Sequence, residues 1–260
     1  MSNLLYIKER VIQGLLETKE YKSNFYIGLL SHLTFTSVLT FSTYIVLNFS
    51  SSINLSLLEI IFLMLYAQVM AMFFGLFRWG NKLNQELVTG KINVYLMKPK
   101  NTFFQYLLNS IPYFSIPLPI IDFLLLMVFS LSFSLFDFSK LLSTFIISIP
   151  GGIMYVLFFR FFDSMAFFMK NNKFLVKNYY VIERGYYQFP LIIFDGFLNK
   201  LGLVVGHSVF GILPVLYYFD KIDNNIILEM YIVIFPVIIL LLIGIIINWK
   251  IGLKKYEAYE

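Results

Sequence analysis

Long apolar runs constrain this chain more than any other feature of its sequence. A bilayer core of about 30 Å needs about 20 apolar residues of helix, because lipid offers no hydrogen-bond partner to exposed backbone. Five stretches meet this condition and are free of net charge over most of their length: Phe25–Phe49, Leu55–Phe77, Ile111–Phe136, Leu141–Met169 and Ile226–Trp249. Each is predicted to be a transmembrane helix.

A sixth apolar region is interrupted by prolines, glycines and charges between Tyr186 and Phe219. We expect a span over Leu201–Phe219, preceded by an in-plane amphipathic segment over Tyr187–Lys200. The whole chain is 59% hydrophobic and only 13% charged, which excludes an ordinary soluble domain. The predicted fold is therefore all-α, a polytopic membrane protein with six transmembrane helices in a single transmembrane domain over residues 1–260.

Basic residues are concentrated on one side of the predicted spans. They precede the first span and follow the second, fourth and sixth, whereas the opposite side holds only Lys140 and Lys221. Because basic loops are retained in the cytoplasm, both termini are predicted to be cytoplasmic and the protein is expected in the plasma membrane, crossing it several times. The net charge of +5 is then explained by the basic cytoplasmic segments. We therefore expect lipid as a partner but no nucleic acid.

The sequence offers no catalytic or metal centre. It has no cysteine, and its two histidines, His32 and His207, have no companions at metal-ligand spacing. The sole Gly-Lys pair, Gly90-Lys91, has Gln85 where a phosphate-binding loop requires glycine. We expect a non-catalytic chain that binds no metal, ATP or other cofactor itself.

Two polar segments outside the spans carry helical patterns. Residues 1–24 place apolar and charged side chains on separate stripes, which predicts an amphipathic helix, either a membrane-interface anchor or a surface that packs on a partner. Residues 78–101 carry Leu83, Leu87 and Val88 at helical spacing, with Gly90 as a C-terminal stop and Pro99 beyond. Such apolar residues must be buried against the spans or another protein.

Three segments together carry a family resemblance. ELVTGKINVYLMKPKNTFFQY (86–106) resembles the segment after the second span of ABC-2 type exporter permeases. Residues 188–220 are similar to the proline-containing approach to the fifth span in these permeases, and NWKIGLKKYEAY (248–259) to their C-terminal tail. Their order and spacing extend the resemblance over essentially the whole chain.

The resemblance implies a permease subunit of an ATP-driven exporter. Two ATP-binding cassette subunits would bind ATP and Mg, and a second permease chain, identical or homologous, would complete the complex. The 78–101 element would be the coupling helix that contacts the nucleotide-binding subunit, and the segment 170–200 would be cytoplasmic or in-plane. The contact residues expected on this basis are Asn84, Glu86, Leu87, Gly90, Tyr95 and Leu96.

Ionisable residues inside spans are costly, so each needs a partner or a function. Arg160 and Asp163, at i and i+3, form either a structural pair or the lining of a polar path. Asp122 has no local partner, and we expect it to bond Arg160. Prolines at 117, 119 and 150 predict kinks or local unwinding in the third and fourth spans.

Two other classes of function stay open at this point. A membrane-embedded enzyme acting on lipid-linked substrates needs a cluster of acids, histidines or a nucleophile at one membrane face. A secondary transporter is expected to show inverted repeats and paired ionisable residues near the midplane. The exporter alone requires ATP and a separately encoded partner.

Overall fold

The computed structural model describes residues 3–20, 22–49, 55–78, 82–98, 101–169, 172–188, 202 and 208–256, and every regular element in them is helical. His207 and most of the expected in-plane segment, residues 189–200, lie outside this part of the chain. Four of the described helices are long and apolar enough to cross a membrane. They are built on α3 (Leu57–Arg78), α7 (Pro117–Ser132), α8 (Phe138–Ser164) and α12 (Asn224–Lys255).

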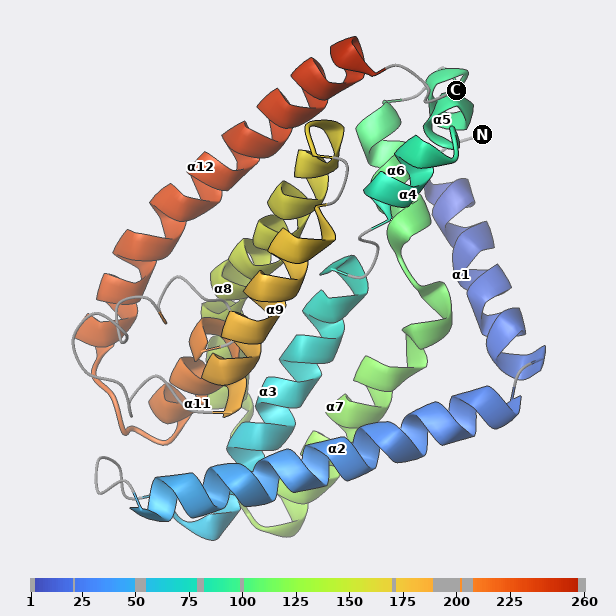
Figure 1. Ribbon diagram of the computed structural model, residues 1–260. Coiled ribbons are helices and arrows are strands. Elements are labelled where there is room, and N and C mark those ends of the chain that lie inside the picture. Colours follow the sequence, from blue (N-terminus) through green and yellow to red (C-terminus); the bar gives the residue numbers. More distant parts are fainter. Residues whose placement is uncertain are drawn as a thin grey trace.

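Shorter and peripheral helices complete the bundle (Figure 1). α1 (Asn3–Glu20) leads into α2 (Lys22–Phe49), which runs across α3 and α7 in this view and contacts α3. The π-helical turn η4 (Ser208–Ile212) and α11 (Leu213–Tyr218) form a short apolar helix beside α8, within the predicted fifth span, Leu201–Phe219. α9 (Lys173–Gln188) lies in the segment expected to be cytoplasmic or in-plane, and its Tyr179 ring stacks 5.1 Å from Phe158 of α8.

α3 is the centre of the main core. Most side chains in its middle are buried, among them Phe62, Leu63, Met64 and Tyr66, because α2, α7, α8 and η4 all pack on it. α8 approaches closely through Gly152, where an added Cβ would lie 1.9 Å from the Phe74 ring. Small residues at such contacts are what allow membrane helices to pack tightly.

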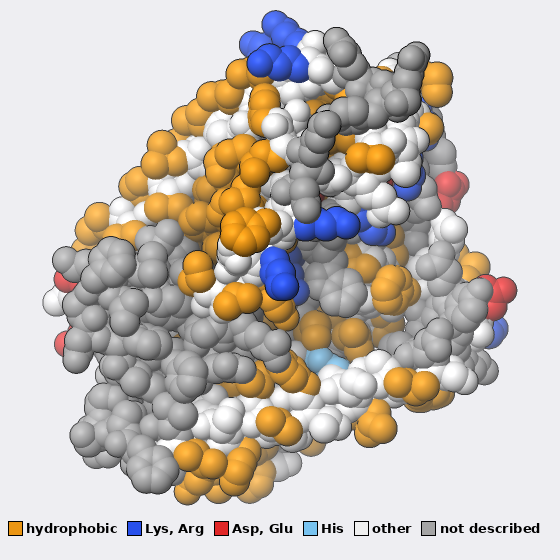
Figure 2. All heavy atoms as spheres, in the orientation of Figure 1, with side chains coloured by type: hydrophobic (Ala, Val, Ile, Leu, Met, Phe, Trp, Pro, Cys, Tyr) orange, Lys and Arg blue, Asp and Glu red, His pale blue; other side chains and the backbone are white. Residues whose placement is uncertain are grey.

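α12 has the opposite character. Isoleucines and leucines are exposed along its length, and Figure 2 shows this row of hydrophobic side chains with a group of basic side chains at its upper end. Lys254 and Lys255 lie in the last turn of the helix. An apolar surface ending in lysines is expected of a helix that faces lipid and emerges at a basic membrane surface.

The two ends of the bundle differ in charge. One end holds α4 (Leu83–Val88), α5 (Ile92–Leu96), α6 (Thr102–Ser110), the start of α1 and the end of α12 (Figure 1), and is called the basic end below. The opposite end carries two ion pairs: Lys140 Nζ lies 2.5 Å from Asp220 Oδ2, and Lys221 Nζ lies 3.6 Å from Glu59 Oε1.

Prolines act differently in the two spans where bends were predicted. The third span is interrupted before Pro117 and not at the predicted prolines: α6 ends at Ser110, a single 3-10 turn η1 (Tyr113–Ser115) follows, and α7 begins at Pro117 and continues through Pro119. Proline suits a helix start because its missing N–H has no intrahelical partner there. α8, in contrast, stays helical through Pro150, so the local unwinding predicted there is absent.

Candidate partner interface and its anchoring network

α4 and α5 form a helical hairpin at the basic end, joined by a turn at Gly90. Gly90 has φ +69°, a left-handed conformation that glycine adopts without steric cost, and its N–H donates to the Leu87 carbonyl at 3.2 Å. The helix stop predicted at Gly90 is therefore confirmed. Each of the two short helices has one buried and one exposed face.

The inward face of the hairpin belongs to a second apolar core, separate from the main one. It consists of Leu83, Leu87, Ile92, Tyr95, Tyr106, Ala166, Ile245 and Trp249. Trp249 of α12 contacts two further elements: its ring centroid lies 5.1 Å from that of Phe103 and 5.4 Å from that of Tyr106, both in α6, and 5.1 Å from that of Phe167 in η2 (Met165–Phe167). The hairpin is thereby packed onto the ends of α8 and α12.

The outward face of the hairpin is apolar and exposed. Met97 is 78% exposed and Leu96 46%, and Val88 and Val94 are exposed as well. Lys82, Lys91 and Lys98 are exposed beside them. An apolar patch rimmed by lysines outside the spans is typical of a protein-docking surface.

The expected contact residues fall into two groups. Leu96 is exposed, and Asn84 and Gly90 are half-buried. Glu86, Leu87 and Tyr95 are buried inside the chain, where they support the hairpin. Val88, which the sequence placed on one apolar stripe with Leu83 and Leu87, is exposed while those two are buried. Sequence reasoning also missed Val94 and Met97 as surface residues, although each lies two positions after a buried residue and so on the other side of the chain.

Glu86 is the centre of a small buried polar network under the hairpin. It is 5% exposed, and its Oε1 accepts from the Tyr95 hydroxyl at 3.2 Å and lies 3.5 Å from Lys91 Nζ. Gln105 of α6 donates to the Tyr95 carbonyl at 3.1 Å. A carboxylate buried with these partners fixes α4, α5 and α6 relative to one another.

Arg160 and Asp163 join the hairpin region to three helices. Arg160 Nη2 donates to the Phe77 carbonyl at the end of α3 and to Ser110 Oγ of α6 at 2.7 Å. Arg160 Nη1 lies 3.9 Å from Asp163 Oδ2, as the i, i+3 spacing predicted, and the Tyr106 hydroxyl donates to Asp163. The same carboxylate faces the Leu83 backbone N–H at the start of α4.

Tyr106 of α6 is the neutral donor in this network. Burial, followed by the negative charge of Asp163, raises the pKa of its hydroxyl well above the ordinary tyrosine value. It therefore keeps its proton and its hydrogen bond to Asp163 at any physiological pH.

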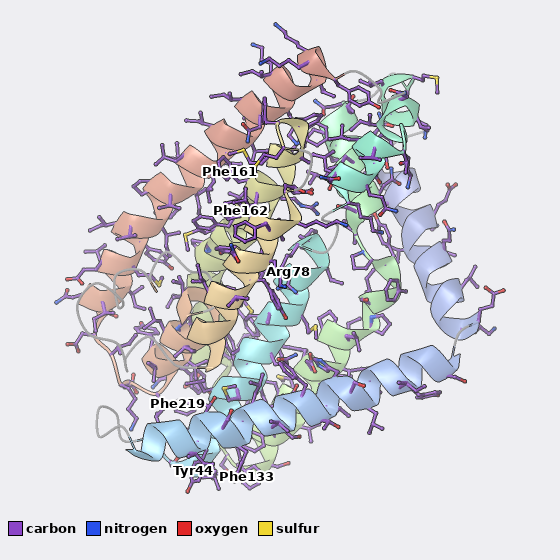
Figure 3. All side chains as sticks on the ribbon, viewed as in Figure 1. Tyr44, Arg78, Phe133, Phe161, Phe162 and Phe219 are labelled. Atoms are coloured by element: carbon purple, nitrogen blue, oxygen red, sulfur yellow. The ribbon has the colours of Figure 1, made fainter. Side chains whose placement is uncertain are left out.

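Arg78 connects the end of α3 to α8 and α9. Its guanidinium donates to the Tyr155 hydroxyl and lies 5.0 Å from the Phe159 ring centroid and 5.3 Å from that of Tyr180 (Figure 3). Such cation–π contacts are strongest where water is excluded. α9 is thus held at the same end of α3 that leads into the hairpin.

Asp122 does not bond Arg160, and that expectation was wrong. Its carboxylate contacts His32 of α2 instead, with Nε2 2.9 Å from Oδ1 and 3.0 Å from Oδ2. Arg160 lies near the end of α8, where Phe77, Ser110 and Asp163 occupy it. The pairing of α2 with α7 could not be read from the sequence, because the two residues are 90 positions apart.

Together the described helices define a polytopic membrane protein with an exposed apolar patch on the hairpin at its basic end. Within the described residues no three His, Cys, Asp or Glu side chains gather to hold a metal ion. A family model described as ABC-2 family transporter protein matches residues 30–259. The chain belongs to this family, and it is a membrane component of an ABC transporter. No curated protein and no solved structure matches it.

Proposed function

We propose that this chain is the six-span permease subunit of an ATP-driven exporter, in the plasma membrane with both termini in the cytoplasm. The observation that carries the proposal is the α4–α5 hairpin, with an exposed apolar face outside and a buried polar network beneath. The start of α1 and the end of α12 lie at the same end of the bundle, which supports an even number of crossings (Figure 1).

In this proposal two nucleotide-binding subunits bind ATP and Mg and dock on the hairpins of two permease chains. Closure of the ATP-bound subunits pushes on Val88, Val94, Leu96 and Met97. Because Arg160 and Asp163 tie the hairpin to the ends of α3, α6 and α8, the push moves these helices as a body rather than deforming the loop. The pathway for the cargo opens between the two permeases.

The complex is tested by mild detergent extraction of the tagged chain from its native membrane. A stoichiometric ATP-binding cassette subunit in the purified sample is the expected result, and a second permease shows whether the pair is identical or mixed. A chain that is reproducibly alone, after crosslinking and with added lipid, contradicts the proposal.

The docking face is tested by Met97→Glu combined with Leu96→Glu. Placing two carboxylates on an apolar interface core is expected to weaken capture of the ATPase subunit by at least about 100-fold, since each central contact contributes about 2 kcal/mol. Met97→Leu at the same position keeps the apolar contact and is the matched control. If the double variant captured the ATPase subunit as well as the original chain, the interface would lie elsewhere on the protein.

A further inference from the structure

A cavity between α2, α3 and α7 lies apart from the partner interface. Its volume is about 630 Å³, within the range of roughly 300–1,000 Å³ found for small-molecule sites. Its walls are largely apolar and include Leu33, Leu65 and Leu125. Tyr44 of α2 and Phe133 after α7 also line it and lie at the same end of the molecule, opposite the basic end (Figure 3).

Asp122 is the only charged residue among those that line this cavity in the described part of the chain. It is 3% exposed and lies on α7 inside the membrane-spanning region. A carboxylate at this depth is expensive, and an apolar residue would pack α7 against α2 at lower cost. The acid is therefore better explained by a ligand than by packing.

His32 supplies one donor nitrogen to this carboxylate. Its Nε2 lies 2.9 Å from Asp122 Oδ1 and 3.0 Å from Oδ2, so both oxygens share the same nitrogen. The Gln68 amide nitrogen lies 3.3 Å from His32 Nδ1 and 3.4 Å from Nε2, beside the ring. The two oxygens of a carboxylate offer about four acceptor positions, so within the described residues one shared donor leaves Asp122 able to accept from a ligand.

We propose that this cavity binds an amphipathic cation, with its positive group at Asp122 and its hydrophobic body against α2 and α7. Hydroxyl groups of Thr36 and Thr40 on the α2 wall bond to carbonyls of their own helix, so they need no partner from the ligand. Amphipathic cations would then be the substrate class of the proposed exporter, and in that respect the inference rests on the proposed function. Binding itself needs neither ATP nor the partner subunit.

Equilibrium binding of radiolabelled tetraphenylphosphonium to the full chain in lipid nanodiscs tests this proposal. We expect a saturable component that excess unlabelled tetraphenylphosphonium displaces. Asp122→Asn, which keeps the shape of the side chain and its contact with His32, is expected to weaken that component by at least about tenfold. Binding of neutral triphenylphosphine oxide should change by less than about threefold. Ser132→Ala, at the cavity wall without a charge, is the matched control.

Two results would overturn the proposal: no saturable cation binding to the unmodified chain, or undiminished binding by Asp122→Asn. Leu125→Trp supplies an independent variant, because it fills the cavity and leaves Asp122 in place. It is expected to abolish the saturable component, and retained binding would place the cation elsewhere. Capture of an ATPase subunit is measured separately, so failure of this site and failure of the exporter assignment are distinguishable.

Discussion

At the scale of single residues, Arg160 is the side chain on which the basic end depends most. It is buried and connects α3, α6 and α8 through Phe77, Ser110 and Asp163. Arg160→Met leaves Asp163 buried without its counter-charge, so we expect a loss of about 3 kcal/mol in the free energy of unfolding. Thermal unfolding of the detergent-solubilised chain measures this loss.

The double variant Arg160→Met with Asp163→Asn separates charge from packing. Removing both charges is expected to recover at least about 1 kcal/mol of the lost stability, because the uncompensated carboxylate is gone. Arg160→Lys, which keeps the charge but has only one donor group, should lie between the single variant and the original. A single Arg160→Met variant as stable as the original chain would show that the network does not hold the helices together.

At the scale of elements, α1 is attached to the bundle through a glycine. A Cβ added at Gly14 would lie 2.4 Å from Tyr113 Cβ and 2.6 Å from the Tyr113 carbonyl carbon, so the helix must move away from η1. We therefore expect Gly14→Ala to speed hydrogen exchange of the α1 amides. Gly28→Ala in α2 is the matched control, since nothing lies within 4 Å of its added Cβ, and it should gain up to about 1 kcal/mol in helix propensity. Equal exchange in both variants would mean that α1 is not packed at this point.

Periodicity and helix-stop residues predicted the elements well, but not how they pair. Leu83, Leu87 and Gly90 indicated the hairpin because local spacing determines a short helix and its end. The partners of Asp122 and Glu86 depend on helices brought together by the fold, and no local pattern records them. Glu86 shows the consequence: it looked like a surface contact, yet Tyr95 and Lys91 hold it in a buried position.

At the scale of the whole molecule, the described residues form two apolar cores, one among the long helices and one beneath the hairpin. The main core lies around α3, whereas the second joins the hairpin to Trp249 of α12 and Ala166 of η2 (Met165–Phe167). Hydropathy predicted the first core, since long apolar runs leave few other structures in lipid. Hydropathy did not predict the second core, because its residues come from five short or terminal segments of mixed polarity. Trp249, within the tail that resembles the family, was the one available signal.

The orientation of the whole molecule is open to direct measurement, because the chain contains no cysteine and a single introduced thiol has no background. Ser139→Cys, at the start of α8, is expected to react with a membrane-impermeant maleimide on intact cells. Met97→Cys, at the exposed face of the hairpin, should react only after the membrane is permeabilised, because basic segments stay in the cytoplasm. If Met97→Cys reacted on intact cells and Ser139→Cys only after permeabilisation, the orientation would be the reverse of the proposed one. The hairpin would then lie outside the cell, where it could not contact an ATP-binding subunit.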